Sequence, residues 1–438
     1  MADTHQEASI RIDIRQLQPG LYVSLGGRWL EHDFLFNAFR LATQGQVDRL
    51  KASGMTHVDY WPGKSTAQPL PLADPQAAPA ASDHQPRPSS VAELASTQAM
   101  PGASAVPAQR EARLARIRTR RTELARCERA YRESVAAVKN LMSEIFVSPA
   151  QAARSAKAVV GQTIEELLSS QHAVVHLMND ALTDPNARQH ALNVTVLSLM
   201  LGREQGLRND ALSNLGLGAL LHDIGKTLVA SQVLLQPAEQ RNRHEEAAYR
   251  QHVHQGEGLC RQLGLDAPDL LACVLQHHER MDGRGFPAGL TGDGIALSAR
   301  IVAIANRYDN LCHATDVAHS LTPFEALAWL YRREASALDA MLLQRFVRCL
   351  GVWPPGTIVQ LTNGTIGLVT SSGAQDSLRP TLLMADLQVP RNEALLVDLA
   401  EIPEVKIEKA LRPRDVASEL LEYLSPRHGA AFFVGRAA

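Results

Sequence analysis

The chain has 438 residues, 45% hydrophobic and 21% charged, a composition typical of a soluble globular protein with about two to four domains. Its 44 Lys and Arg against 46 Asp and Glu leave a formal charge of −2, which excludes a protein that coats DNA or RNA with positive charge. The five cysteines form no Cys-x-x-Cys pair, and no apolar run approaches the roughly 20 residues needed to cross a membrane. We therefore expect a cytoplasmic protein with reduced thiols and no association with a membrane.

Residues 9–62 predict a small separate module of strands and one helix. Its first segment, IRIDI, alternates apolar and polar side chains, as a half-buried strand does. Pro19-Gly20 marks a turn before a second strand, LYVSL. Gly54 caps a helix-like stretch over 44–52 and precedes a last strand, THVDYW. A module of this size is too small for catalysis alone and suits a sensory or docking role.

The next two segments differ sharply in composition. Residues 63–108 are dominated by Pro, Ala, Ser and Gln and cannot bury enough apolar surface to offset the entropy of ordering, so we expect a disordered linker. Residues 109–178 have the three-four spacing of long connecting helices, and the first stretch is rich in arginine. We interpret that stretch as a solvated face, and a homodimer through the connecting helices is one predicted assembly.

Residues 179–349 keep helical periodicity and form the predicted core of a mainly α fold. Thr322 and Glu325 have the spacing of a capping box, and Gly351 ends the last helix of this core. Residues 350–402 show three short strands, with Asn363-Gly364 at a type I′ turn between the first two. We therefore expect a small C-terminal β-sheet that closes the helical unit, whereas the tail at 403–438 carries no clear pattern.

The strongest chemical signal is the segment LHDIGK at the end of an apolar helix. Its adjacent His222 and Asp223 can reach one metal ion, through a ring nitrogen and a carboxylate oxygen. Lys226 follows three residues later and can reach an anion held by that metal.

A second signal is the segment HHERMDGRGFP at 277–287. The consecutive His277 and His278, followed by the carboxylate of Glu279 and a glycine-rich turn, form a dense cluster of ligand types. Glycine lets a backbone approach a ligand closely. His190 and His252 are further candidates for the same site.

In order and spacing, LHDIGK, HHERMDGRGFP and the downstream IVAIANRYDNL resemble the HD-GYP family. That family is a branch of the HD metal-dependent phosphohydrolases and hydrolyses cyclic di-GMP. The N-terminal pattern RIDIRQLQPGLYVSLGGRWLEHDF resembles a small domain of unknown function often found before HD-GYP domains. The resemblance implies an all-helical HD-type core, a two-metal centre and a role in bacterial second-messenger signalling.

Carried onto this sequence, the resemblance implies two sets of metal ligands that share one carboxylate. The first set is His190, His222, Asp223 and Asn306, and the second is Asp223, His252, His277 and His278. Asp223 and Lys226 are the implied catalytic residues, with Lys226 on a phosphate oxygen of cyclic di-GMP. The implied substrate pocket contains Arg280, Asp282, Gly285, Phe286 and Pro287. Because the ligands are rich in histidine, two divalent transition-metal ions, Fe or Mn, fit better than Mg. Such ions promote in-line attack of water on phosphorus.

Four positions depart from the family pattern. Asn306 stands where the family has an aspartate ligand, and its amide oxygen brings no charge. Phe286 lacks the hydroxyl of the GYP tyrosine, and Gln236 stands in place of an expected lysine. Asn186 occupies the position of a glutamate that a third metal ion would need.

Three functions therefore compete. Intact motifs favour a cyclic di-GMP phosphodiesterase, and Asn306 keeps open a degenerate receptor or adaptor that binds cyclic di-GMP or a GGDEF-type partner. The third is an HD phosphohydrolase for another nucleotide. We interpret Asp309 as a group behind the metal ligands. Three other histidines, His172, His176 and His254, are interpreted as structural.

Overall fold

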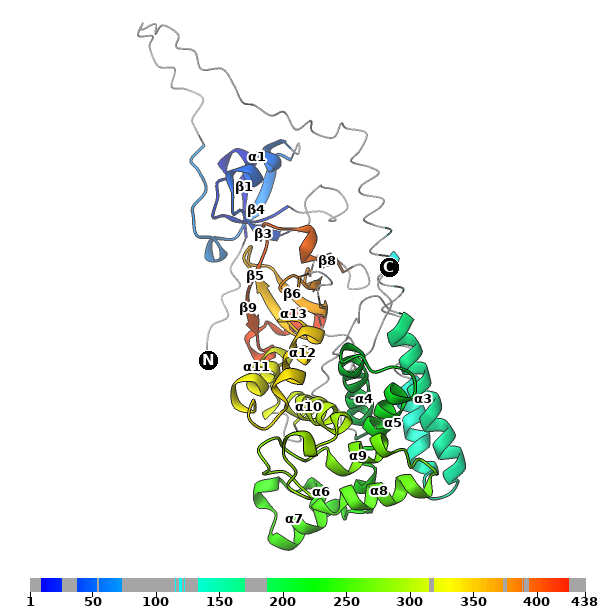
Figure 1. Ribbon diagram of the computed structural model, residues 1–438. Helices are drawn as coiled ribbons and strands as arrows, with labels where there is room; N and C mark the ends of the chain where they lie inside the picture. The colour runs from blue at the N-terminus through cyan, green and yellow to red at the C-terminus, as the bar shows by residue number, and fades with distance from the viewer. Residues whose placement is uncertain are drawn as a thin grey trace, which may run out of the picture. The chain divides into compact units, whose positions relative to one another are not determined.

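A computed structural model describes residues 9–25, 38–52, 55–72, 133–169, 187–314, 319–372, 376–387 and 394–424, with a few isolated positions between these ranges (Figure 1). They fall into two compact units, one within Met1–Arg118 and a larger one that comprises Thr119–Thr362 and Ile366–Ala438. Within the described residues, no helix is long and apolar enough to cross a membrane. Most of the predicted linker, Gly54, His172 and His176 lie outside these residues, so their interpretation stays a prediction.

The smaller unit is a four-stranded antiparallel sheet with one helix. The strand order is β1 (Ile10–Asp13), β4 (His57–Tyr60), β2 (Tyr22–Ser24) and β3 (Ala38–Arg40), and α1 spans Gln44–Ala52. Its core is formed by apolar side chains from all of these elements, among them Leu21, Val23 and Leu50. The chain remains part of this unit beyond the predicted boundary at 62, because the Leu70 amide donates to the carbonyl of Gln16 (2.8 Å).

The helices of the larger unit pack around α4 (Ala187–Glu204), in which every residue from 191 to 202 is buried. Helices that contact α4 are α3 (Pro149–Ser169), α5 (Asn209–Leu221), α10 (Leu297–Cys312) and α12 (Ala340–Leu350). The remaining helical segments are 133–144, α6 (Ser231–Leu235), α7 (Arg243–Arg250), α8 (His252–Gln262), α9 (Pro268–Gln276) and α11 (Pro323–Arg333). This arrangement confirms the predicted mainly α core.

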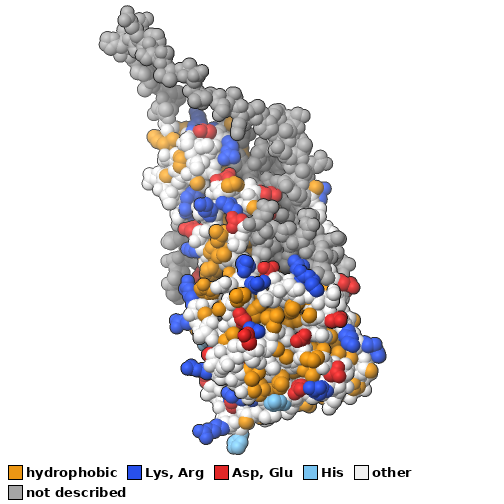
Figure 2. Space-filling model, in the orientation of Figure 1, with side chains coloured by type: hydrophobic (Ala, Val, Ile, Leu, Met, Phe, Trp, Pro, Cys, Tyr) orange, Lys and Arg blue, Asp and Glu red, His pale blue; other side chains and the backbone are white. Residues whose placement is uncertain are grey.

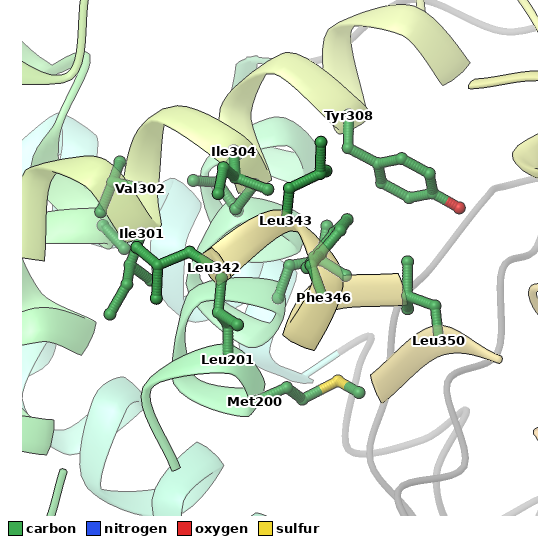
Figure 3. Packing of buried hydrophobic residues seen from close by; sticks show 14 of the residues in the cluster. Met200, Leu201, Ile301, Val302, Ile304, Tyr308, Leu342, Leu343, Phe346 and Leu350 are labelled. Atoms are coloured by element: carbon green, nitrogen blue, oxygen red, sulfur yellow. The ribbon is translucent and has the colours of Figure 1, made fainter. Parts of the chain in front are cut away.

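Interlocking side chains from α4, α10 and α12 form one hydrophobic cluster (Figure 3). The rings of Tyr308 and Phe346 meet edge to face, with centroids 5.3 Å apart. Burial of each large apolar side chain contributes about 1.5–3 kcal/mol relative to exposure. This cluster therefore holds α10, which carries Asn306 and Asp309, firmly against α4, which carries His190.

Two helix boundaries follow from local sequence signals, as predicted. Thr322 and Glu325 form a reciprocal capping box at the start of α11, with Pro323 in its first turn. Helix α12 ends at Leu350, and Gly351 follows with a φ of +79°, a conformation that favours glycine.

The C-terminal sheet is larger than predicted. It has five antiparallel strands in the order β8 (Leu396–Asp398), β7 (Thr381–Met384), β6 (Ile366–Ser371), β5 (Ile358–Leu361) and β9 (Ile407–Leu411). Strand β9 and the following α13 (Ser418–Leu424) lie beyond 402, in the segment that showed no clear pattern. The guanidinium of Arg412, just after β9, donates to Glu325 (2.6 Å) and so ties the sheet to the first turn of α11.

The turn between β5 and β6 is not the predicted type I′ turn. That turn needs a positive φ at both central residues, and of Asn363 and Gly364 only Gly364 has one (+81°). Gln360 pairs with Ile366, so the connection is also longer than two residues. Asn363 instead stabilises the loop by accepting a hydrogen bond from the Thr365 hydroxyl (2.7 Å).

Candidate metal centre

The His-Asp pair lies where helix α5 ends. The last turns of α5 are buried, and this places His222 in the interior with no exposed surface. At Asp223 the backbone leaves the helix (φ −102°, ψ 8°) and continues into the short 3-10 segment η4 (Ile224–Leu228). The change of direction lets two adjacent side chains face one centre.

A close backbone contact brings α8 to this pair. A side-chain carbon at Gly225 would overlap the carbonyl oxygen of His252 and crowd the amide of Gly256, so only glycine permits η4 and α8 to touch. His252, the first residue of α8, is therefore buried with its Nε2 3.5 Å from Oδ1 of Asp223.

The two remaining histidines follow the end of α9. His277 lies directly after the last residue of this helix, and its ring centroid is 4.9 Å from that of His222. The ring of His278 lies 4.2 Å from that of His277 and 5.1 Å from that of His252. With His190 of α4, whose Nε2 lies 3.7 Å from Oδ2 of Asp223, histidines from four separate segments meet at this carboxylate.

These side chains form two groups with the spacing of metal ligands. The first ligand group is His190, His222 and Asp223, and the second ligand group is Asp223, His252, His277 and His278; within each group the ligand atoms lie within 4.8 Å of one another. Oδ2 of Asp223 is 3.3 Å from Nε2 of His222, and Oδ1 is 3.5 Å from Nε2 of His277. One carboxylate therefore faces both groups with different oxygens.

The hydrogen bonds of the histidines leave their inner nitrogens available. Nδ1 of His222, His252 and His277 lies 2.6–3.0 Å from the carbonyl oxygens of Ala219, Tyr249 and Val274, respectively. Because a carbonyl only accepts, each Nδ1 carries the proton and each Nε2 presents a lone pair. The five Nε2 atoms of the two groups and Oδ1 of Asp223 are buried without a hydrogen-bond partner, which a metal ion would resolve.

Electrostatics keeps these ligands in their metal-binding protonation states. Burial lowers the pKa of His277 to about 4 and holds the pKa of His278 well below its usual value. Burial opposes the charge of Asp223, but Lys226 and His222 outweigh it and hold the pKa of that carboxyl well below the ordinary range. At neutral pH the second ligand group, Asp223, His252, His277 and His278, therefore offers neutral imidazoles and an ionised carboxylate.

Lys226 and Tyr249 border the same centre. The ammonium of Lys226 lies 2.6 Å from Oδ2 of Asp223, so the structure pairs it with the shared carboxylate. The ring of Tyr249 lies 5.0 Å from that of His252 and 5.6 Å from Nζ of Lys226. Our sequence analysis missed Tyr249, although it stands three residues, about one helical turn, before His252.

Glu279, which follows the histidine pair in the sequence, contacts the glycine-rich loop. Its two carboxylate oxygens accept hydrogen bonds from the amides of Ala288 (2.7 Å) and Leu290 (2.9 Å). Glu279 therefore holds the glycine-rich loop in place, and Gly285 lets that loop pass against the backbone of residues 278–280, where a side chain would collide.

The predicted pocket residues lie on this loop. Arg280 and Asp282 form an ion pair at 2.7 Å, which lowers the pKa of Asp282 to about 2. Phe286, which precedes Pro287, stacks on His278 with ring centroids 4.4 Å apart and planes 18° from parallel. The loop thus joins the second ligand group through this stack and through an edge-to-face contact of Phe286 with His252, with ring centroids 6.3 Å apart.

Asp309 acts behind His190, as the sequence suggested. This buried carboxylate lies 2.7 Å from Nδ1 of His190 and accepts a hydrogen bond from Asn193 (2.9 Å). His313 contacts it as well, at 3.0 Å. The contact orients His190 and raises its strength as a ligand.

Asn306 lies one turn before Asp309 on α10 and is buried. Its amide oxygen accepts a hydrogen bond from Asn310 (2.7 Å). Two other positions lie apart from the ligand groups, since the amide of Gln236 donates to the carbonyl of Gln240 and His254 is exposed on α8.

Two family models match the chain. Residues 9–156 match a domain of unknown function, DUF3391, and residues 166–342 match the HD domain. The second match contains every residue of both ligand groups.

The chain is also similar to several known proteins. The chain is similar to the cyclic di-GMP phosphodiesterase PA4108 of Pseudomonas aeruginosa, with 29% identity over 84% of this chain and 83% of that protein. It is also similar to the cyclic di-GMP phosphodiesterase response regulator RpfG of Xanthomonas campestris, with 32% identity over 34% of this chain and 39% of that protein. Among solved structures, Bd1817, an HDG"Y"P protein of Bdellovibrio bacteriovorus, is 15% identical over 78% of this chain and 99% of that one, with a TM-score of 0.41.

Proposed function

We propose that this protein of the HD-GYP family, in which a DUF3391 domain precedes the HD domain, is a metal-dependent phosphodiesterase that hydrolyses cyclic di-GMP to linear pGpG or GMP. The observation that carries the proposal is the convergence of five unpartnered imidazole Nε2 atoms on the two oxygens of Asp223. The similarity to PA4108, which extends over most of both chains, supports cyclic di-GMP as the substrate.

Two divalent ions, Fe or Mn, fit the donor set. The first ligand group would hold one ion and the second ligand group the other, with Asp223 shared. Asn306, which the family resemblance assigns to the first ion, would add a neutral amide oxygen. When bound, such ions activate water and stabilise the charge that develops on the phosphoryl oxygens. Histidine-rich sites with one carboxylate suit transition metals better than Mg²⁺.

The protein's own charges then act on the substrate. Lys226 carries a positive charge beside Asp223. Burial alone would lower the pKa of its ammonium, but the negative charge of Asp223 outweighs burial and raises that pKa. In the metal-loaded protein this ammonium is placed to contact a phosphate oxygen instead of the carboxylate. Arg280, Asp282, Gly285, Phe286 and Pro287 shape the neighbouring wall of the pocket.

A degenerate receptor is the second candidate, because Asn306 brings no charge to the first ligand group. The complete set of histidines and the shared carboxylate favour the enzyme over this alternative. A GGDEF-type partner and a homodimer through the connecting helices remain predictions, as does a location in the cytoplasm.

The decisive experiment combines metal analysis with turnover. Protein loaded with Mn or Fe is expected to contain up to two ions per chain and to convert cyclic di-GMP to a linear product. Tight binding of cyclic di-GMP without any turnover, at full metal occupancy, would instead identify the chain as a receptor.

A further inference from the structure

Two arginines, one just before helix α7 and one at its last residue, lie against aromatic rings that border the second ligand group. Cζ of Arg241 lies 4.0 Å above the centroid of the Tyr249 ring, and Cζ of Arg250 lies 4.9 Å above the centroid of Phe286. Figure 2 shows positively charged side chains at the end of the larger unit where α7 lies. Each arginine thus stands one ring away from the histidines of the metal centre.

The two guanidinium groups are held very differently. Arg241 is 9% exposed, donates through Nε to the carbonyl of Val233 (3.2 Å), and contacts Glu246 (3.5 Å). Arg250 is 51% exposed, and its single hydrogen bond among the described residues runs from Nε to Glu246 (2.8 Å). Arg241 is therefore part of the scaffold, whereas both terminal nitrogens of Arg250 remain available to a ligand.

Phe286 links Arg250 to the metal centre in one stack. His278 covers one side of the Phe286 ring at 4.4 Å, and the guanidinium of Arg250 lies over the same ring at 4.9 Å. The cation–π contact and the bond to Glu246 fix the plane of the guanidinium. The two terminal nitrogens of Arg250 are therefore oriented before a ligand binds. Phe286 separates them from His278 of the second ligand group.

A fixed arginine fork with two free N–H groups matches one nucleobase edge especially well. Guanine presents two acceptors, O6 and N7, at the spacing that a guanidinium bridges, whereas adenine presents a donor amino group beside N7. A base lies one sugar away from its phosphate, so a phosphate at the metal centre leaves its base at the rim of the pocket. The same fork could pair with the second phosphate, and the test below separates these contacts.

We propose that Arg250 recognises a guanine base of the bound cyclic dinucleotide and so determines specificity for guanine. The proposal rests on the proposed function and deepens it, since it assigns base recognition to a residue outside the ligand groups and the glycine-rich loop. Phe286 acts as a positioning residue for Arg250, because its ring carries the guanidinium.

The test compares Arg250→Gln with a matched control, using the full chain loaded with Mn. Arg261→Gln is the control, because Arg261 is also half-exposed (57%) and also bonds a glutamate one turn earlier, Glu257 (2.9 Å). We expect Arg250→Gln to lower affinity and kcat/KM for cyclic di-GMP about 10- to 100-fold, the effect of losing one bidentate base contact. The preference of Arg250→Gln for cyclic di-GMP over cyclic di-AMP should fall by the same factor. Arg261→Gln should show the affinity and kcat/KM of the wild type.

The outcomes separate this proposal from the proposed function. A variant within twofold of the wild type on cyclic di-GMP, or one that loses cyclic di-GMP and cyclic di-AMP equally, overturns base recognition by Arg250. Because affinity is measured as well as turnover, a wild-type chain that binds without hydrolysing overturns the proposed function alone and still tests Arg250. A wild-type chain that binds no cyclic di-GMP overturns both.

Discussion

The two ligand groups share Asp223 but are supported in different ways. In the second ligand group, His252 and His277 are held by backbone carbonyls, and burial keeps the pKa of each of its histidines low. In the first ligand group, His222 is also held by a backbone carbonyl, that of Ala219, but His190 is held by the carboxylate of Asp309, at 2.7 Å. The second ligand group thus relies on three neutral imidazoles in a largely buried site. The first ligand group relies in addition on the negative charge of Asp309 behind His190.

This difference predicts that the two ligand groups bind metal ions with unequal affinities. Three imidazoles and a carboxylate form a nearly complete shell for a transition metal, whereas the first ligand group has two imidazoles and the same carboxylate. Asp309 and Asn306 then determine the metal affinity of the first ligand group. Asp309 supplies a negative charge from outside the shell, and Asn306 offers only a neutral oxygen.

The largest effect is expected when Asp223, the carboxylate that both ligand groups share, is removed. Asp223→Ala should release most of both ions and lower turnover at least about 10³-fold, beyond the loss of a single transition-state contact. Metal content by mass spectrometry, turnover and circular dichroism measure the three consequences. Full metal occupancy in a folded Asp223→Ala protein would show that the groups do not meet at this carboxylate.

Asp309→Asn should affect only the first ligand group. Loss of the charge behind His190 is expected to weaken one ion about 10- to 100-fold while the other stays bound. Titration with Mn should then resolve two affinities that lie further apart than in the wild type. Equal weakening of both ions would contradict the separation of the groups.

The metal-free protein should be sensitive to acid because of the second ligand group. The pKa of His277 is about 4 in the folded protein and about 6.5 in the unfolded chain, so the unfolded chain binds this proton at a higher pH. Stability is therefore lost as pH falls from about 6.5 towards 4, by about 2 kcal/mol at pH 5 for His277 alone. Urea unfolding of chelator-treated protein at pH 7 and pH 5 measures the loss, and an unchanged midpoint would refute it.

The smallest effect is expected at Asn306. Asn306→Asp adds a negative charge on α10 and should tighten the ion of the first ligand group about tenfold, after the cost of burying that charge. Turnover at limiting Mn should rise, and turnover at saturating Mn should change little. Asn310→Ala, which frees the amide oxygen of Asn306 without adding charge, is the control. Identical Mn dependence of wild type and Asn306→Asp would show that position 306 is not a ligand.

The site was predictable where its residues are neighbours in sequence. His222 and Asp223 are adjacent, so their joint role could be proposed from one motif. His190 joins them across the fold, with its ring 5.2 Å from that of His222; the sequence marked it as a candidate, and only the family resemblance placed it in the same ligand set. The role of Glu279 could not be predicted from its neighbours in sequence, because its partners, the amides of residues 288 and 290, reach it only after the loop has folded.

The same limit applies to the fold. The capping box at Thr322 and the helix end at Gly351 are local, and both were predicted. Strand β9 gains its identity from pairing with β5, more than 40 residues earlier, and the segment alone gave no signal for it. The turn at Asn363-Gly364 depends on the register of β5 and β6, which the dipeptide does not determine.

The contact of Gly225 with the first turn of α8 has a consequence for both ligand groups. Because backbone atoms touch there, the separation between the two ligand groups is set by the main chain and not by the length of any side chain. A single added methyl group at 225 would push His252 away from Asp223 and so separate the second ligand group from the carboxylate that it shares with the first. The geometry of the centre can thus be lost in this fold while every ligand side chain remains chemically intact.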